Sequence, residues 1–395
     1  MVSVHVIASV DEFLEACDVL ERGFGPVAID AERASGFTYS QRAYLIQVHR
    51  RDAGTFLFDP PAIGSLRQLT SSVPDEEWVL HAASQDLACL RDVGIDPPRI
   101  FDTELSARLL GMPKVGLGSV MAEVLDVHLA KEHSAVDWST RPLPDPWLAY
   151  AVGDVERLVD LRDAMHEMLR EADKLDWALS EFEATRTKPE KPAHDEPWRR
   201  LSGLHTLRQP RQLAVARALW LARDKRAQAL DVSPGRLIPD AAIVAAAAAN
   251  LSSQEELARL KTFTGRASRS ELPRWWQAVA EGQVAGDLPV LRVPTEGPPH
   301  PRSWKDKRPE AAARLDSARP AIRELAETHN VPTENLISPA VVRELCWEPP
   351  DDLSESTLTA ALEAAGARAW QAQLVAPVLV EAFARSAVES ETDTA

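Results

Sequence analysis

The first β-prone segment of this chain, Val27-Ala28-Ile29, runs into two acids, Asp30-Ala31-Glu32. Successive side chains of a strand point to opposite faces, so Asp30 and Glu32 are expected to share one face, about 7 Å apart along the chain. Two neighbouring carboxylates are costly to bury unless a cation lies between them. The segment therefore predicts a strand that carries a cation site, although the D-x-E pattern by itself is more typical of a solvated strand end.

Further β-prone and helical patterns surround this strand. Short runs bounded by turn residues or charges predict strands at 44–48, 55–58 and 78–80. Ser9 and Glu12 form a capping box that predicts a helix through Leu20. Other helical patterns lie at 86–93, 105–110, 117–125 and 146–169. Strands early and helices later, with one strand pair joined too briefly for a crossover, predict an α/β fold with a mixed sheet flanked by helices.

The length of 395 residues predicts two or three domains. Two segments that are polar or rich in proline predict linkers at 185–196 and 285–302. They separate a first domain at 1–184 from two helical domains at 197–284 and 303–386 and from an acidic tail at 387–395. The helical segments form a divergent repeat, because Val232-Ser233-Pro234-Gly235-Arg236-Leu237-Ile238 aligns with Val331-Pro332-Thr333-Glu334-Asn335-Leu336-Ile337.

Two more acids and a tyrosine follow patterns that place them near predicted element ends. Asp86 comes after the strand at 78–80 and begins a helix, where helix capping is the alternative interpretation. Tyr150 and Asp154 are four residues apart, so a helix would present both on one face. Each feature alone is more typical of ordinary structure, and only the set of five side chains favours a site.

In this order, D-x-E, an acid after a strand and loop, and Y-x-x-x-D on a helix resemble the DEDDy branch of the DEDD exonuclease superfamily. Gln47, Phe101-Asp102-Thr103 and the stretch Asp137-Trp138-Ser139 with Arg141-Pro142-Leu143 extend the resemblance to ribonuclease D over roughly 4–169. The helical repeats resemble HRDC domains, the second less closely than the first. Ala31 and Arg33 depart from the family pattern, which often has an apolar residue after the second acid.

The resemblance implies a ribonuclease H-like domain that acts as a metal-dependent 3′→5′ exoribonuclease. It implies two divalent cations, Mg²⁺ or Mn²⁺, whose preference for hard oxygen ligands suits carboxylates. Asp30, Glu32 and Asp154 would hold the cation that binds the attacking water, and Asp30 and Asp86 would hold the other. Tyr150 would orient or deprotonate that water. The implied partner is RNA with a free 3′ end, such as a tRNA precursor.

The net charge of −16 argues at first against a nucleic-acid partner, but the charges are segregated. Bases outnumber acids from 198 to 276, and Arg217, Arg223 and Arg226 are predicted to contact nucleic acid together with Gln47. A solvated helical face is the alternative for the three arginines.

The broader patterns of the chain predict a cytoplasmic protein. No segment approaches the roughly 20 apolar residues of a membrane span, and the three cysteines lie far apart. No obligate protein partner is implied. The competing functions are a DNA-directed 3′→5′ exonuclease, which would use the same acids, and a non-catalytic nucleic-acid adaptor.

Overall fold

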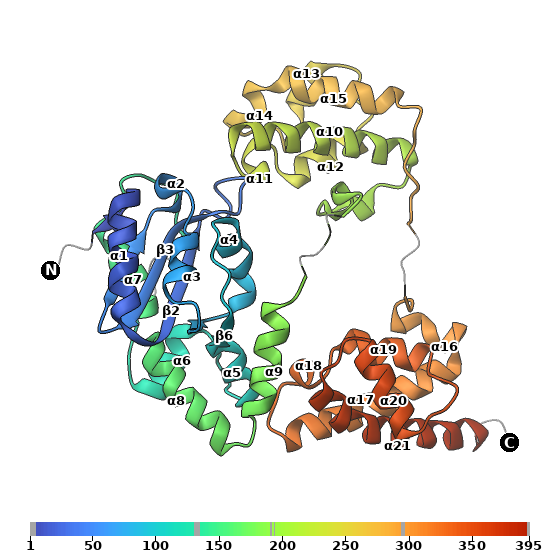
Figure 1. Cartoon of the computed structure of the whole chain (residues 1–395). Helices are drawn as coiled ribbons and strands as arrows, with labels where there is room; N and C mark the ends of the chain where they lie inside the picture. The colour runs from blue at the N-terminus through green and yellow to red at the C-terminus, as the bar shows by residue number, and fades with distance from the viewer. Residues whose placement is uncertain (1–4, 130–134, 190–191, 193, 294–296, 393–395) are drawn as a thin grey trace.

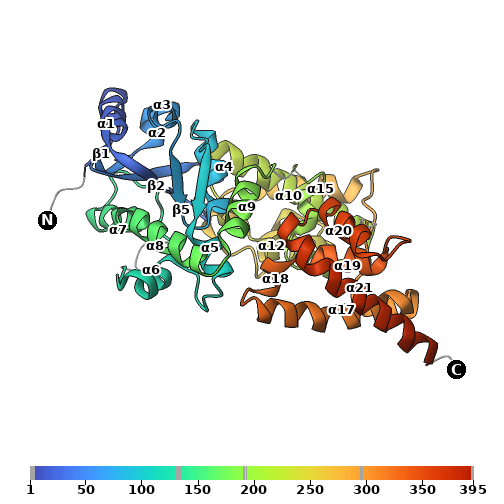
Figure 2. The same cartoon turned by 60° about the horizontal axis from the view of Figure 1, so that its bottom comes forward.

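The computed structural model describes residues 5–129, 135–189, 192, 194–293 and 297–392, which form a sheet domain followed by two helical domains (Figure 1). Figure 2 shows the C-terminal helix leading away from the sheet domain. Within these residues no helix is both long and apolar enough to cross a lipid bilayer.

The sheet domain is built on six strands in the order β1-β4-β3-β2-β5-β6. Its centre is β2 (Phe24–Arg33), which runs antiparallel to β3 (Ala43–Arg51) and parallel to β5 (Glu77–Leu80). The other strands are β1 (Val6–Ile7), β4 (Gly54–Phe58) and β6 (Arg99–Asp102). Both parallel and antiparallel pairs are present, which confirms the predicted mixed sheet. The sequence patterns missed β1 because two residues are too few to show a period of two. They missed β6 because it has only two apolar residues, flanked by charged ones.

Helices cover this sheet and mostly begin where the sequence predicts. Ser9 caps α1 (Val10–Arg22) and accepts a hydrogen bond from the Glu12 amide, as the capping box requires. The next α-helices along the chain are α2 (Pro60–Ile63), α3 (Arg67–Ser72), α4 (Leu87–Asp92), α5 (Thr103–Leu109) and α6 (Leu117–Leu125).

The predicted single helix at 146–169 is wrong, because the chain forms α7 (Asp145–Glu156) and α8 (Leu158–Glu171). Arg157 leaves the helical conformation with φ −110° and ψ 6°. The break allows α7 to pack on β2, β3 and β4 while α8 packs on β2 and β5. Helical periodicity continues across the break, so the sequence pattern does not reveal it.

A further helix, α9 (Leu175–Arg186), ends the first domain and extends into the segment predicted as a linker from residue 185. Its apolar residues pack on the sheet domain, and Phe182 lies 4.9 Å from Phe101 between ring centres. Its other side meets the second helical domain, where Trp177 stacks on Trp370 with ring centres 4.6 Å apart. The last helix of the first domain is thus also the docking surface for the C-terminal part.

The two helical domains repeat one arrangement, which confirms the predicted internal repeat. In each, a long helix is followed by one helical turn and then by a nine-residue helix. The first contains α10 (Pro210–Leu230), α11 (Pro234–Leu237), α12 (Asp240–Ala248), α13 (Gln254–Arg259), α14 (Arg266–Ser270) and α15 (Leu272–Val284). The second contains α16 (Trp304–Lys307), α17 (Pro309–Thr328), α18 (Thr333–Leu336), α19 (Pro339–Trp347), α20 (Glu355–Ala364) and α21 (Ala369–Thr392).

The acidic segment at 387–395 is not a separate tail over the residues that the structure describes. Helix α21 continues to Thr392. Alanine and glutamate favour the helical backbone, so the polar composition of this segment does not by itself end the helix.

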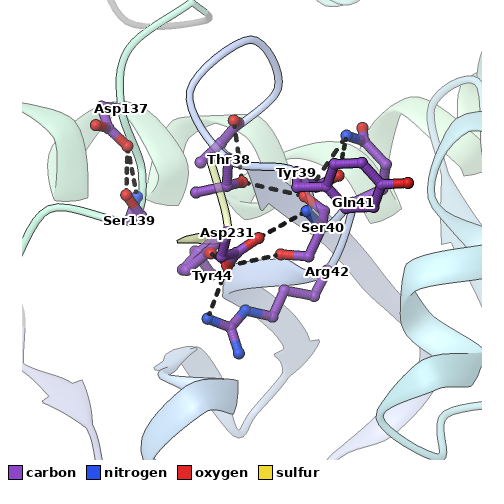
Figure 3. Close-up of polar contacts among 10 residues, drawn as sticks. Thr38, Tyr39, Ser40, Gln41, Arg42, Tyr44, Asp137, Ser139 and Asp231 are labelled. Atoms are coloured by element: carbon purple, nitrogen blue, oxygen red, sulfur yellow. Dashed lines mark hydrogen bonds and ion pairs between the residues drawn. The ribbon is translucent and has the colours of Figure 1, made fainter. Parts of the chain in front are cut away.

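The first helical domain docks on the connection between β2 and β3 through the end of α10 (Figure 3). Asp231 accepts hydrogen bonds from the Ser40 amide at 2.8 Å and the Tyr44 hydroxyl at 3.3 Å, and lies 3.5 Å from the Arg42 guanidinium. Beside it, the Tyr39 hydroxyl donates to Asp224. One carboxylate thus holds Ser40 and Arg42 of the connection together with Tyr44 at the start of β3.

We expect Asp231→Ala to loosen the β2–β3 connection and accelerate amide hydrogen exchange several-fold in peptides that cover residues 36–44. The reason is that the amide and hydroxyl donors lose a charged acceptor. Asp173→Ala is the matched control, since Asp173 also has a positive φ (57°, against 47° for Asp231) and shares the backbone cost of alanine. Equal exchange in the two variants would contradict the role given to Asp231.

Candidate active site

A cavity of about 600 Å³ opens beside the C-terminal end of β2, and all five residues of the predicted site line it. Asp30 and Glu32 come from β2, and Asp86 comes from the turn between β5 and α4. Tyr150 and Asp154 come from α7, one helical turn apart. Side chains separated by more than a hundred positions in the sequence therefore meet in one place.

Three of the four acids form a compact group. One carboxylate oxygen each of Asp30, Glu32 and Asp154 lies within 4.8 Å of the others. Such a group of oxygens suits a hard divalent cation. Asp86 lines the same cavity outside this group, and it makes no capping hydrogen bond to α4. Its carboxylate instead lies 3.4 Å from the Arg33 guanidinium.

Gln47 holds Asp30 in place from the neighbouring strand. The two residues are partners in the antiparallel register of β2 and β3, and the Gln47 amide donates to Asp30 Oδ2 at 2.8 Å. Gln47 is fully buried. The sequence predicted that Gln47 contacts nucleic acid, but a fully buried side chain is not accessible to it. Gln47 instead orients Asp30 through this hydrogen bond.

Asp102 organises the turn that delivers Asp86. Its carboxylate accepts hydrogen bonds from the amides of Ala82 and Ala83 at 3.0 and 2.9 Å, and it also caps α5. Burial raises the pKa of Asp102 to about 6, while these backbone hydrogen bonds act in the opposite direction. The sequence offered one signal for this role, an aspartate directly between a strand and a helix.

The stretch that begins at Asp137 packs against α7, the helix that carries Tyr150 and Asp154. Trp138 is fully buried, with its ring centre 5.5 Å from Trp147 and 6.5 Å from Tyr150. Arg141 anchors this stretch by pairing with Asp59 at 2.6 Å and donating to the Tyr44 carbonyl at 2.7 Å. The position of Tyr150 is therefore set by aromatic packing that Arg141 holds in place.

Burial raises the pKa of every acid in the cavity, and neighbouring carboxylates raise the pKa of Glu32, Asp86 and Asp154 further. Burial acts first and the neighbouring carboxylates second: they raise the pKa of Glu32 to about 9, of Asp86 to about 8 and of Asp154 to about 7. Burial also raises the pKa of Asp30. Without a cation the cavity consequently retains protons at neutral pH, which a divalent ion would displace.

The surroundings of Tyr150 favour the protonated phenol. Burial, followed by the charges of Asp154 and Glu32, raises the pKa of its phenol well above the ordinary value. The hydroxyl forms a hydrogen bond with Asp154. The protonated phenol can therefore orient a ligand or water next to the acid group.

The three predicted arginine contacts lie in the first helical domain, and each guanidinium is paired there. Arg223 is buried and bonds to Asp240 at 2.7 Å and to the Ile238 carbonyl. Arg217 and Arg226 are partly exposed, and their partners are Asp287 at 3.0 Å and Glu271 at 2.6 Å. A phosphate contact by Arg223 would require this buried pair to break.

Comparison with known families agrees with this division of the chain. Residues 4–170 match the family described as a 3′-5′ exonuclease, and residues 212–279 match the HRDC domain. Residues 297–383 match a family described as a 3′ to 5′ exonuclease C-terminal domain. The HRDC prediction is thus confirmed for the first helical domain. The second helical domain matches the exonuclease C-terminal family instead of the HRDC family.

Whole proteins with this arrangement are similar to the chain. A ribonuclease D of Gluconacetobacter diazotrophicus is 32% identical over 282 residues, which cover 69% of this chain and 71% of the relative. A ribonuclease D of Pseudomonas paraeruginosa is 30% identical over 329 residues, or 81% and 83% of the two chains. The chain belongs to the ribonuclease D family. The predicted family and 3′→5′ exoribonuclease class are confirmed, and the adaptor and DNA-directed alternatives are not favoured.

Two solved structures share the fold over nearly the whole chain. A protein from Bifidobacterium adolescentis is 33% identical with a TM-score of 0.89, covering 96% of this chain and 97% of the other. Escherichia coli RNase D, described as an exoribonuclease involved in structured RNA processing, is 24% identical with a TM-score of 0.70 and covers 97% and 99%. The three-domain architecture is therefore common to these proteins.

We expect the cation-free protein to lose thermal stability as the pH rises from about 5 to about 9. Asp and Glu titrate near pH 4 when unfolded, but the cavity acids titrate near 7 to 9 when folded. The folded state then binds more protons in this window, so stability falls with rising pH. Melting curves in EDTA at several pH values measure the slope.

Glu32→Gln should reduce this slope, because it removes the acid with a pKa of about 9. Glu15→Gln, at an exposed position on α1, serves as the control. Identical slopes for wild type and Glu32→Gln in EDTA would show that the cavity acids do not carry raised pKa values.

Proposed function

We propose that this ribonuclease D family member uses Asp30, Glu32, Asp86, Asp154 and Tyr150 to release 5′-mononucleotides from RNA 3′ ends. The observation that carries the proposal is the approach of one oxygen each of Asp30, Glu32 and Asp154 to within 4.8 Å, in the cavity that Asp86 and Tyr150 also line.

The donor set fits two divalent cations, Mg²⁺ or Mn²⁺. Every candidate ligand is a carboxylate, and the mutual repulsion of these acids favours compensation by positive charge. Asp30, Glu32 and Asp154 would hold one ion, and Asp30 with Asp86 the other. Bound there, two such ions supply a nucleophile at neutral pH and stabilise charge on the entering and leaving oxygens.

The protein's own groups would position the reactants. The Tyr150 hydroxyl, held by packing against Trp138, would orient the attacking water beside Asp154. Gln47 would keep Asp30 aimed into the cavity. Glu32 would accept a hydrogen bond from the terminal 3′ hydroxyl, which would restrict the reaction to free ends.

RNA is the proposed substrate class, and tRNA precursors are a specific candidate. The support is that the similar curated proteins are ribonucleases D. A groove between α10 and α15 of the HRDC domain is lined by Arg217, Lys225 and Arg274 and has a volume of about 550 Å³. We propose that Arg217 and Lys225, rather than the buried Arg223, contact backbone phosphates there. Three buried free cysteines fit a cytoplasmic location.

We expect Asp30→Asn to lower Mn²⁺-dependent hydrolysis of a 5′-labelled RNA oligonucleotide by more than about 100-fold. A direct ligand should matter more than the outer-sphere partners whose loss typically costs 10–100-fold. The melting temperature should not fall, since one charge leaves a repulsive cluster. Asp11→Asn on the exposed start of α1 is the control. Metal-dependent activity in purified Asp30→Asn protein would disprove the assignment.

A 3′-phosphorylated oligonucleotide should resist digestion, because the phosphate removes the hydroxyl donor and places negative charge next to Glu32. Product analysis compares it with the same strand after phosphatase treatment, which should restore digestion. Rapid release of mononucleotides from the phosphorylated strand would contradict the role of Glu32 at the 3′ end.

A further inference from the structure

Arg33 is the last residue of β2 and occupies a position where the ribonuclease D pattern often has an apolar residue. The register between β2 and β3 shifts here, because Glu32 pairs with Leu45 whereas Arg33 pairs with Ala43. Regular alternation would send Glu32 and Arg33 to opposite faces. The extra residue at this bulge is Tyr44 of β3, and both Glu32 and Arg33 line the cavity.

Among the described residues that line the cavity, Arg33 is the only lysine or arginine. Its guanidinium lies 3.4 Å from Asp86, and its side chain is 26% exposed. The charge of Arg33 also acts against the raised pKa values of Glu32 and Asp86. In the cation-free protein, Arg33 is thus the positive charge that partly compensates the acids.

Charge balance changes once the cavity is loaded. Two divalent cations would neutralise the four carboxylates of Asp30, Glu32, Asp86 and Asp154 completely. The Arg33 guanidinium would then be the uncompensated charge, and it matches the single negative charge of a phosphodiester. Arginine is also suited to this ligand by geometry, because its planar fork binds phosphate oxygens in pairs.

We propose that Arg33 is a phosphate-binding residue. Its guanidinium pairs with Asp86 in the cation-free cavity and binds the RNA phosphate instead when Asp86 becomes a metal ligand. This inference rests on the proposed function, and it adds a catalytic contact outside the set of four acids and a tyrosine. Because Arg33 is partly exposed at the end of a strand, it can exchange partners without unfolding its surroundings.

The test uses full-length Arg33→Met, which keeps the length of the side chain but removes the charge and the donors. Calorimetric titration with Mn²⁺ in the absence of RNA should show affinity tighter by about 2- to 5-fold, the range for loss of one partly exposed ion pair that competes with the cation. Single-turnover hydrolysis at saturating Mn²⁺ and RNA should be slower by at least about 10-fold, as expected for loss of a charged hydrogen bond to the reacting phosphate.

Arg51→Met is the matched control. Arg51 pairs with Asp160 and Asp163 and is 28% exposed, but it does not line the cavity. It should change neither measurement. Arg33→Lys should recover part of the rate, since it restores the charge without the planar fork.

Tighter Mn²⁺ binding together with slower hydrolysis supports the proposal. Weaker Mn²⁺ binding with slower hydrolysis would make Arg33 a structural residue, and unchanged values would leave it without a role; either result overturns the proposal. Faster hydrolysis would make Arg33 an inhibitory competitor, which also overturns it. Absence of metal-dependent hydrolysis in the wild type would instead refute the proposed function, while the Mn²⁺ titrations would still report on the ion pair.

Discussion

Repulsion among four buried carboxylates is the constraint on which the site depends. Asp30, Glu32, Asp86 and Asp154 converge on one cavity, and burial raises the pKa of each. The charges of neighbouring carboxylates raise the pKa of Glu32, Asp86 and Asp154 further. Such an arrangement opposes folding unless protons or cations compensate it. A divalent cation held by the carboxylate oxygens would relieve this repulsion. The cluster of acids that would bind the cation therefore lowers the stability of the folded protein until a cation binds.

The surrounding scaffold resists this repulsion with rigid contacts. Gln47 fixes Asp30 through the register of two paired strands, and Asp102 fixes the turn before Asp86 through backbone amides. On the opposite side, Arg141 and Trp138 support the helix that carries Tyr150. The four acids are thus held by three separate parts of the fold, β2, the turn after β5 and α7, and these rigid supports keep the group from relaxing apart when no cation is present.

The helical domains contribute contacts that reach toward this centre. Asp231 of the HRDC domain binds Tyr44, whose backbone carbonyl accepts a hydrogen bond from Arg141. Tyr44 is also the residue skipped in the register next to Glu32 and Arg33. The second helical domain docks on α9, the last helix of the first domain, where Trp370 stacks on Trp177. The architecture therefore links the HRDC domain to β3, the strand paired with the one that bears Asp30 and Glu32.

Local sequence patterns predicted the mixed sheet and the helical repeat, because periodicity and capping are properties of neighbouring residues. The resemblance to the DEDDy exonucleases predicted the five site residues, which the structure brings to one cavity. The sequence patterns missed β1 and β6, merged α7 with α8, and left Arg33 as an unexplained departure. Only the tertiary structure decided that Gln47 and Arg223 are buried and that Arg33 faces Asp86 across 3.4 Å. Burial, ion pairing and pKa depend on which distant elements pack together, and that information is not contained in the spacing of residues along the chain.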